Sequence, residues 1–320
     1  MMRAILLALS RSRRMQSWTM RSRLTRSTVD RFIAGNTLDA AVVNGRRLND
    51  LGILLTMDHV GEAVSDEPSA DVAAREYHEI LHRIPAEALK ATISVKPSQL
   101  GLALDPARCG TRFHELVAES RKLGIMVEID MEDSPYTDTT LAMYRELLGV
   151  NPALRVCLQA YLRRCNKDIE DLIALKGSVR LVKGAYKEPA SIAFQKKSEV
   201  DDNYVRLMEA GLSKRAVDNG FYLAIATHDE SLVEIARQLA ANNGIGKDKF
   251  EFQFLYGVRF DLQQQLAADG YTVRVYLPYG QEWYPYFMRR LAERPANVLF
   301  ILRALLRGPG AAPAPRLPAP

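Results

Sequence analysis

Between residues 32 and 306 the chain alternates between short apolar runs and longer amphipathic segments. The runs are rich in β-branched residues, which predicts eight strands. They cover residues 52–58, 91–96, 124–130, 154–160, 178–184, 222–229, 250–257 and 272–280. Because they are almost continuously apolar, we expect each strand to be buried on both faces, as in a parallel sheet covered by helices.

The segments between these runs have a helical period. One predicted face carries Ala73, Tyr77, Ile80, Leu81 and Ile84. Eight strand–helix units in about 275 residues match the size of a (βα)8 TIM-like barrel. A doubly wound open sheet is the alternative, but the first predicted strand is followed by neither G-x-G-x-x-G nor a Walker motif.

Polar side chains close nearly every predicted strand. They are Lys96, Asp130, Gln159, Lys183, Thr227, His228, Gln253 and Tyr276. In a barrel these ends form one ring at the carboxyl-terminal mouth, where active sites are built. The pattern therefore predicts an active site at the mouth.

Arg180 and Lys183 lie within one apolar run. Two buried cations require anionic partners, because an unpaired buried charge is costly. Two sources stay open: the carboxylates of Asp130 or Glu251, and a phosphate or ribityl group of a bound cofactor.

A helix is predicted after the last strand, between Pro285 and Pro295. Its positions i, i+3, i+4 and i+7 are Tyr286, Arg289, Arg290 and Glu293. Guanidinium groups bind carboxylates in bidentate geometry, and an aromatic ring covers aliphatic groups, so this face suits a small zwitterion. The alternative is a solvated Arg/Glu face.

The run HEILH from His78 to His82 matches the zinc-protease pattern H-E-x-x-H. The helix is expected to break at Pro85, and the extended form of the pattern is absent. Since this helix lies between the first two strands, its histidines are expected on the barrel exterior. We therefore expect no metal site.

Composition narrows the class of protein. With 48% hydrophobic and 25% charged residues, the 320-residue chain is typical of globular proteins. Its three cysteines have no C-x-x-C spacing, which favours a reducing cytosol over a disulfide framework. The net charge of +5 arises from seven arginines that precede Asp30, so no nucleic-acid partner is expected for the folded body.

Three parts are expected along the chain. Residues 1–31 form a basic extension with a helical part, whose composition also fits a transit peptide. Residues 32–306 form the barrel. Residues 307–320 are rich in proline and alanine and are expected to be disordered.

Seven segments in order identify the chain as similar to a known family. They are SVKPSQLG (94–101), EIDMEDSPYTDTTLAMYR (128–145), LQAYLRR (158–164), RLVKGAYKEP (180–189), IATHD (225–229), EFQFLYGVR (251–259) and VRVYLPYGQEWYPYFMRRLAERPAN (273–297). They resemble proline dehydrogenase of the monofunctional bacterial type. The resemblance implies a distorted (βα)8 barrel with its last helix over the mouth. It also implies non-covalent FAD, oxidation of L-proline to Δ1-pyrroline-5-carboxylate by hydride transfer to FAD, and a quinone as electron acceptor.

The resemblance also implies roles for single residues. The proline carboxylate would lie between Lys96, Arg289 and Arg290. Tyr276, Tyr286 and Leu255 would wall the proline ring, and Glu293 would anchor the arginine pair. Asp130 and Arg180 would be the catalytic residues beside the flavin. The remaining FAD-binding set would be Met131, Gln159, Lys183, Gly184, Ala185, Thr227 and His228, together with Arg180.

Two other functions stay open on the sequence. One is a Schiff-base aldolase on the same barrel, with Lys183 or Lys96 as nucleophile. The other is a non-catalytic sensor of flavin or proline. We expect a cytoplasmic location, with a peripheral contact at the inner membrane through the arginines of residues 1–26 as a further expectation.

Overall fold

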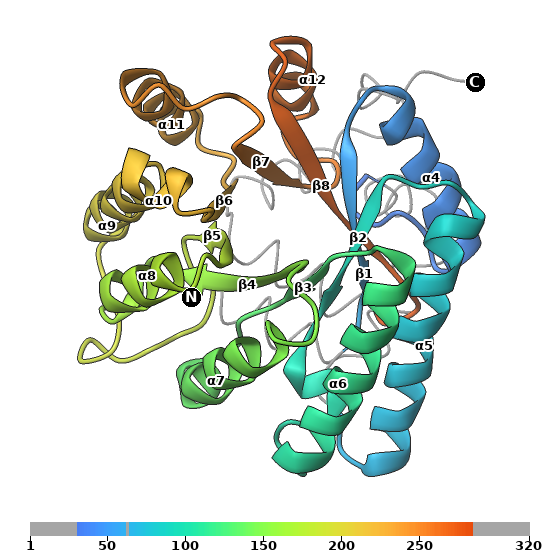
Figure 1. Ribbon diagram of the computed structural model, residues 1–320. Coiled ribbons are helices and arrows are strands. Elements are labelled where there is room, and N and C mark those ends of the chain that lie inside the picture. Colours follow the sequence, from blue (N-terminus) through green and yellow to red (C-terminus); the bar gives the residue numbers. More distant parts are fainter. Residues whose placement is uncertain (1–30, 62–63, 284–320) are drawn as a thin grey trace, which may run out of the picture.

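The computed structural model describes residues 31–61 and 64–283, and these residues form a closed barrel of eight parallel strands (Figure 1). The strands are β1 (Leu54–His59), β2 (Ala91–Val95), β3 (Val127–Ile129), β4 (Leu154–Gln159), β5 (Ser178–Val182), β6 (Tyr222–Ala226), β7 (Phe250–Leu255) and β8 (Thr272–Tyr279). Each pairs with its neighbours in sequence, and β8 closes the ring by pairing with β1 from Leu54↔Arg274 to His59↔Tyr279. The predicted (βα)8 barrel is confirmed.

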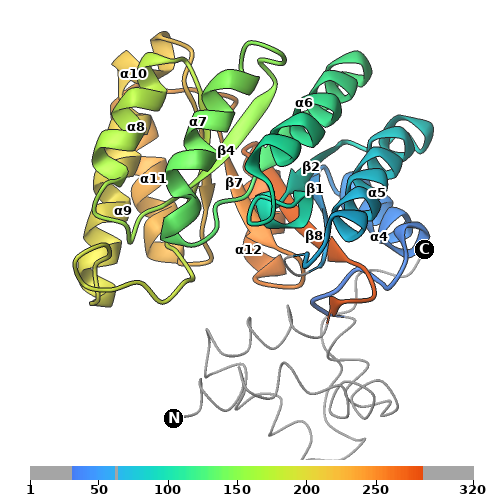
Figure 2. The same ribbon diagram turned by 90° about the horizontal axis from the view of Figure 1, so that it is seen from below.

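Helices surround the barrel on the outside and run alongside its strands (Figures 1 and 2). The described helices are α4 (Leu38–Asp50), α5 (Glu67–Ala86), α6 (Pro106–Leu123), α7 (Thr137–Leu147), α8 (Cys165–Ala174), α9 (Lys197–Gly211), α10 (Lys214–Asp218), α11 (Glu230–Asn242) and α12 (Phe260–Ala268). Short 3-10 turns, η1 (Pro97–Leu100) and η2 (Ser134–Tyr136), follow β2 and β3. The predicted last helix and both termini lie outside the described residues.

Local sequence explains where the helices begin and end. Asp66 caps α5 by accepting a hydrogen bond from the Ser69 amide at 2.8 Å. Asp105 caps α6, with Pro106 at its first position. The predicted apolar face of α5 is buried, as expected. The expected break at Pro85 is wrong by one residue, because the proline ring fits within the last turn and the helix ends at Ala86.

The strands differ from the near-continuous apolar runs that we expected. Their residues alternate between two environments. On β1, Leu55 and Met57 belong to the apolar core, whereas Thr56 and Asp58 are equally buried polar residues. The polar side chains bond across the barrel, so its interior is polar and its outward face is apolar. Ser94 of β2, for example, accepts from Arg180 of β5 at 3.2 Å.

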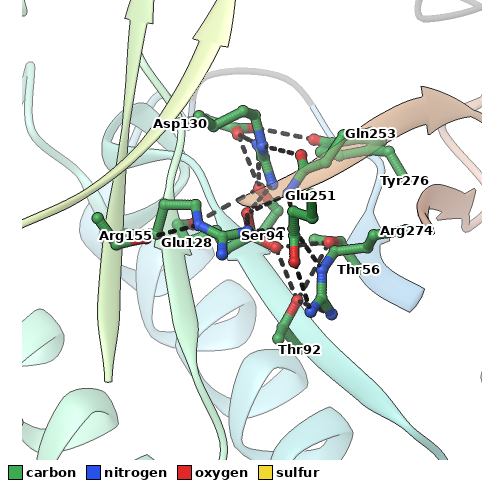
Figure 3. A network of polar contacts seen from close by, with 12 residues as sticks. Thr56, Thr92, Ser94, Glu128, Asp130, Arg155, Glu251, Gln253, Arg274 and Tyr276 are labelled. Carbon is green, nitrogen blue, oxygen red and sulfur yellow. Dashed lines mark hydrogen bonds and ion pairs between the residues drawn. The ribbon is translucent and has the colours of Figure 1, made fainter. Parts of the chain in front are cut away.

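The lower part of the barrel interior is held by ion pairs (Figure 3). Arg274 Nε lies 2.8 Å from Glu251 Oε1, and Arg155 Nη1 lies 2.5 Å from the same oxygen. Arg155 Nη1 is also 3.1 Å from Glu128 Oε2. Burial by itself raises the pKa of Glu251, but Arg155 and Arg274 outweigh it and lower this pKa to about 2.

Replacing Arg155 by methionine tests how far the barrel depends on these pairs. Arg155→Met leaves two buried carboxylates, Glu128 and Glu251, short of a cation. We expect the free energy of unfolding to fall by about 3–5 kcal/mol, as for other broken buried pairs. Urea denaturation followed by circular dichroism measures the change.

Arg215→Met is the matched control, because Arg215 pairs with Glu170 at 2.6 Å while both side chains are exposed. The free energy of unfolding of this variant should fall by less than about 1 kcal/mol. Equal losses for the two variants would show that the barrel interior does not depend on its ion pairs.

Candidate active site

Arg180 joins the floor of the barrel to its mouth. Its Nη2 lies 2.9 Å from Glu128 Oε2, and its Nη1 lies 2.5 Å from Asp130 Oδ1. Its Nε donates to Gln253 Oε1 at 2.8 Å. Burial disfavours the charged guanidinium, but Glu128 and Asp130 outweigh this effect, and the pKa of Arg180 lies above its ordinary value. The arginine is therefore a fixed positive charge below the mouth.

Asp130 accepts from three further groups. Ser94 Oγ and the Tyr276 hydroxyl each donate to it at 2.7 Å, and Lys96 Nζ lies 3.4 Å from Oδ2. Burial raises the pKa of Asp130, but Lys96 and Arg180 outweigh it, so this pKa is lowered. Because the carboxylate is ionised and surrounded by donors, it is a poor general base.

Lys96 lies between two carboxylates at the mouth. Its Nζ pairs with Asp58 Oδ1 and donates to the Tyr276 hydroxyl at 3.2 Å. Burial lowers the pKa of Lys96, but Asp58 and Asp130 outweigh it, so this pKa lies above its ordinary value. A Schiff-base aldolase needs a neutral amine, and the protonated Lys96 is therefore unsuited to be its nucleophile.

These contacts form one continuous chain of alternating charge, which we call the charge chain. In order from floor to mouth its members are Arg274, Glu251, Arg155, Glu128, Arg180, Asp130, Lys96 and Asp58. Cations and carboxylates occur in equal number, so the chain is neutral as a whole. It connects strands β8, β7, β4, β3 and β5 with the ends of β2 and β1.

The residues expected to bind the cofactor lie at the ends of neighbouring strands. Met131, Gln159 and Thr227 are buried at the ends of β3, β4 and β6, and His228 directly follows Thr227. Gln159 Nε2 donates to the Glu132 carbonyl at 2.8 Å. The structure thus brings these expected residues to one side of the mouth.

Lys183 follows β5 on the same side, but its partners differ from those expected. It pairs with Asp201 at 2.6 Å and with Asp229 at 3.1 Å, not with Asp130 or Glu251. The reason is geometric: Arg180 points into the barrel, whereas Lys183 lies three residues later, beyond the strand end. The expected pairing of Arg180 with Asp130 is confirmed, and its pairing with Glu128 was not predicted.

Gly184 allows the backbone after β5 to lie against an aromatic ring. Its φ is +111°, and a Cβ atom there would lie 2.2 Å from the Tyr161 ring. A side chain at this position would therefore force Tyr161 or the loop to move. Ala185 follows it in the same loop.

Two carboxylates tie the loops around the mouth together. Glu132 accepts from the amide of Ser98 at 2.7 Å and from its hydroxyl. Glu188 accepts from the amide of Ser134 at 2.7 Å and from its hydroxyl at 2.6 Å. The loops after β2, β3 and β5 are held in place by these bonds, which the sequence did not reveal.

Not every expected residue can be placed. Leu255 is half-buried at the end of β7, and Tyr276 is in contact with Asp130 and Lys96. The remaining expected substrate residues, Tyr286, Arg289, Arg290 and Glu293, lie outside the described residues. Conversely, Asp58, Glu128, Arg155 and Arg274 belong to the charge chain but were not predicted.

The HEILH motif lies on α5, on the outside of the barrel. His82 is 61% exposed and its Nε2 is 3.5 Å from Glu119 Oε1. In residues 31–61 and 64–283, no group of three or more His, Cys, Asp or Glu side chains is arranged to hold a metal ion. Within the same ranges, no helix has the length and apolar character needed to cross a bilayer.

Comparisons with known proteins agree with this geometry. The family model described as Proline dehydrogenase matches residues 41–303. Proline dehydrogenase 2 of Bacillus subtilis strain 168 is 40% identical over 283 residues, which are 88% of this chain and 92% of that protein. Proline dehydrogenase of Deinococcus radiodurans is 39% identical over 284 residues, 87% of this chain and 90% of that protein.

A solved structure supports the fold. The crystal structure of proline utilization A (PutA) from Bdellovibrio bacteriovorus superposes with a TM-score of 0.79 at 23% identity. The match covers 89% of this chain and 34% of that larger one. The resemblance found in the sequence is therefore confirmed, and the chain belongs to the proline dehydrogenase family of oxidoreductases.

Proposed function

We propose that this protein oxidises L-proline to Δ1-pyrroline-5-carboxylate with bound FAD and passes the electrons to a quinone. Family membership supports the reaction class. One observation carries the proposal: a charged lysine, Lys96, lies at the mouth of the barrel. It donates to Tyr276 and pairs with Asp130, which in turn pairs with Arg180. An anionic substrate group would find a fixed cation there.

The described residues fit FAD. The side of the mouth formed by β3 to β6 offers an amide at Gln159, an ammonium at Lys183 and a hydroxyl at Thr227, and these groups suit an elongated ligand with phosphates. Gly184 has no side chain, so a ligand could approach the backbone closely at this position. When bound, FAD supplies an acceptor for the hydride from the proline ring.

The chain's own residues would bind and orient the substrate. Lys96 would contact the proline carboxylate, together with Arg289 and Arg290 from the segment outside the described residues. The ring of Tyr276 would cover the aliphatic part, and Leu255, Tyr286 and Glu293 would complete that pocket. Hydride transfer depends chiefly on such positioning, so no strong base is required.

Asp130 and Arg180 would supply a fixed electrostatic environment next to the flavin. Both are ionised, and each is bonded to its neighbours on other strands. Fixed charges in a water-poor site stabilise charge changes with little reorganisation. Met131, Ala185 and His228 would complete the flavin contacts.

Absorbance spectra test the proposed function. Purified protein should be yellow, and heat or acid should release its flavin, because the expected attachment is non-covalent. Anaerobic addition of L-proline should bleach the flavin bands. A colourless protein, or bands that L-proline leaves unchanged, would contradict the proposal, and the second result would favour the sensor.

The arginine pair gives a second prediction. Arg289→Met and Arg290→Met should each raise KM for L-proline by about 30-fold or more, since truncating one partner of a buried charged contact costs on the order of 2–5 kcal/mol. Steady-state kinetics with a dye acceptor measure KM, and flavin content should not change. A native KM in both variants would indicate the solvated face instead.

The basic N-terminal segment gives a third prediction, because quinones reside in membranes. We propose that the seven arginines of residues 1–26 contact anionic lipid, at up to about 1 kcal/mol each. Full-length protein should co-sediment with anionic vesicles at low salt, and a variant without residues 1–26 should not. Equal sedimentation of the two proteins would refute this role.

A further inference from the structure

The charge chain ends at Asp58, a residue that the sequence analysis did not single out. Asp58 lies near the end of β1, between β2 and β8, and its side chain is fully buried. Oδ1 pairs with Lys96 Nζ, whereas Oδ2 is buried and has no hydrogen-bond partner in the part of the chain that the structure describes. A buried carboxylate oxygen without a hydrogen bond costs folding free energy, so the presence of an aspartate at this position calls for an explanation.

The surroundings of Lys96 supply that explanation. In the part of the chain that the structure describes, the charged or titratable groups around its ammonium are Asp58 on β1, Asp130 and Glu132 at the end of β3, and Tyr276 on β8. Tyr77 of α5 contacts the Lys96 backbone. Asp130 is shared with Arg180, Ser94 and Tyr276, and Glu132 is bonded to Ser98.

Asp58 differs from these groups, because within the described residues its one ion pair is with Lys96. An ammonium group has three N–H donors. Asp58 and Tyr276 accept two of them, and the third is available to Asp130 Oδ2, 3.4 Å away, or to a ligand carboxylate. The carboxylate of Asp58 therefore fixes the direction of the ammonium as well as balancing its charge.

We propose that Asp58 is a positioning residue for substrate binding, which holds the Lys96 ammonium in place, and charged, to receive the carboxylate of the substrate. This inference rests on the proposed function, because it assigns the Lys96 ammonium to the proline carboxylate. It adds a residue on β1 to Lys96 after β2, Asp130 after β3 and Tyr276 on β8.

Loss of Asp58 should make ligand binding sensitive to pH. Burial disfavours the charged form of Lys96, and without Asp58 the shared carboxylate of Asp130 is the main group opposing this effect. The lysine should then lose its proton at a lower pH than in the native protein. A carboxylate ligand should bind the variant well in mild acid and poorly in mild base.

Calorimetric binding of L-tetrahydro-2-furoic acid to the flavin-loaded protein tests this. An ether oxygen replaces the ring nitrogen in this probe, so its charge stays constant over the range used. In Asp58→Asn we expect Kd within about threefold of the native value near pH 6.5. Near pH 9 we expect Kd at least about tenfold above it, as for a lysine of which only about one in ten keeps its proton at that pH.

Asp168→Asn is the matched control. Asp168 is also a buried aspartate, and it pairs with Arg164 at 2.7 and 3.0 Å on α8, away from the mouth. The Kd of this control variant for the probe should equal that of the native protein at both pH values. Anaerobic reduction by L-proline adds a second readout, in which Asp58→Asn should change the apparent Kd while the limiting rate stays within about twofold.

A double-mutant cycle keeps the test decisive if Asp58→Asn folds poorly. The variant Asp58→Asn/Lys96→Met removes both members of the pair and leaves no unpaired charge between them. If Asp58 acts through Lys96, this double variant binds the probe as Lys96→Met does. A further loss of binding in the double variant would overturn the proposal.

The remaining outcomes separate the two proposals. If native protein is bleached by L-proline and Lys96→Met weakens probe binding, but Asp58→Asn shows the native pH dependence, the role of Asp58 is wrong and the proposed function stands. If Lys96→Met binds the probe with native affinity, the assignment of Lys96 to the carboxylate is itself wrong.

Discussion

The rest of this structure depends on the two ion pairs of Arg180, which join Glu128 in the barrel interior to Asp130 at the mouth. A barrel of this kind is usually filled by apolar layers. Here the interior holds the charge chain, in which each internal member lies between two partners of opposite sign. A buried charge without its partner is unstable. Each member of the charge chain therefore needs its partners.

The same constraint explains the character of the mouth. Asp130 and Lys96 are not free acid–base groups, since the Tyr276 hydroxyl and the neighbouring charges hold both in their ionised forms. Such a site is suited to binding and orienting a charged ligand. The carboxylate bonds of Glu132 and Glu188 extend this order to the loops around the mouth. Hydrogen bonds and ion pairs thus run from the floor of the barrel to the loops at its mouth.

The sequence predicted the strands and most of the polar residues at their ends, because apolar runs and strand-end polarity are local signals. It did not predict Glu128, Arg155 or Arg274, since we took the strands as apolar throughout. A signal was available: polar residues recur at every second position, as in T-I-S-V-K from Thr92 to Lys96, and this period marks an inward face. The sequence could not predict the partners of Lys183, because Asp201 and Asp229 are distant from it along the chain and come close only in the folded protein.

Infrared spectroscopy tests most directly whether the barrel interior is charged. At neutral pH the exposed carboxylates are ionised, so any carbonyl band of a protonated carboxylic acid must come from a buried group. The pKa of Glu128 and that of Glu251 are both lowered by their arginine neighbours, which outweigh burial. We therefore expect that Glu128 and Glu251 contribute no such band in the native protein. A band at neutral pH that disappears in Glu128→Gln or Glu251→Gln would show a neutral interior and contradict this account.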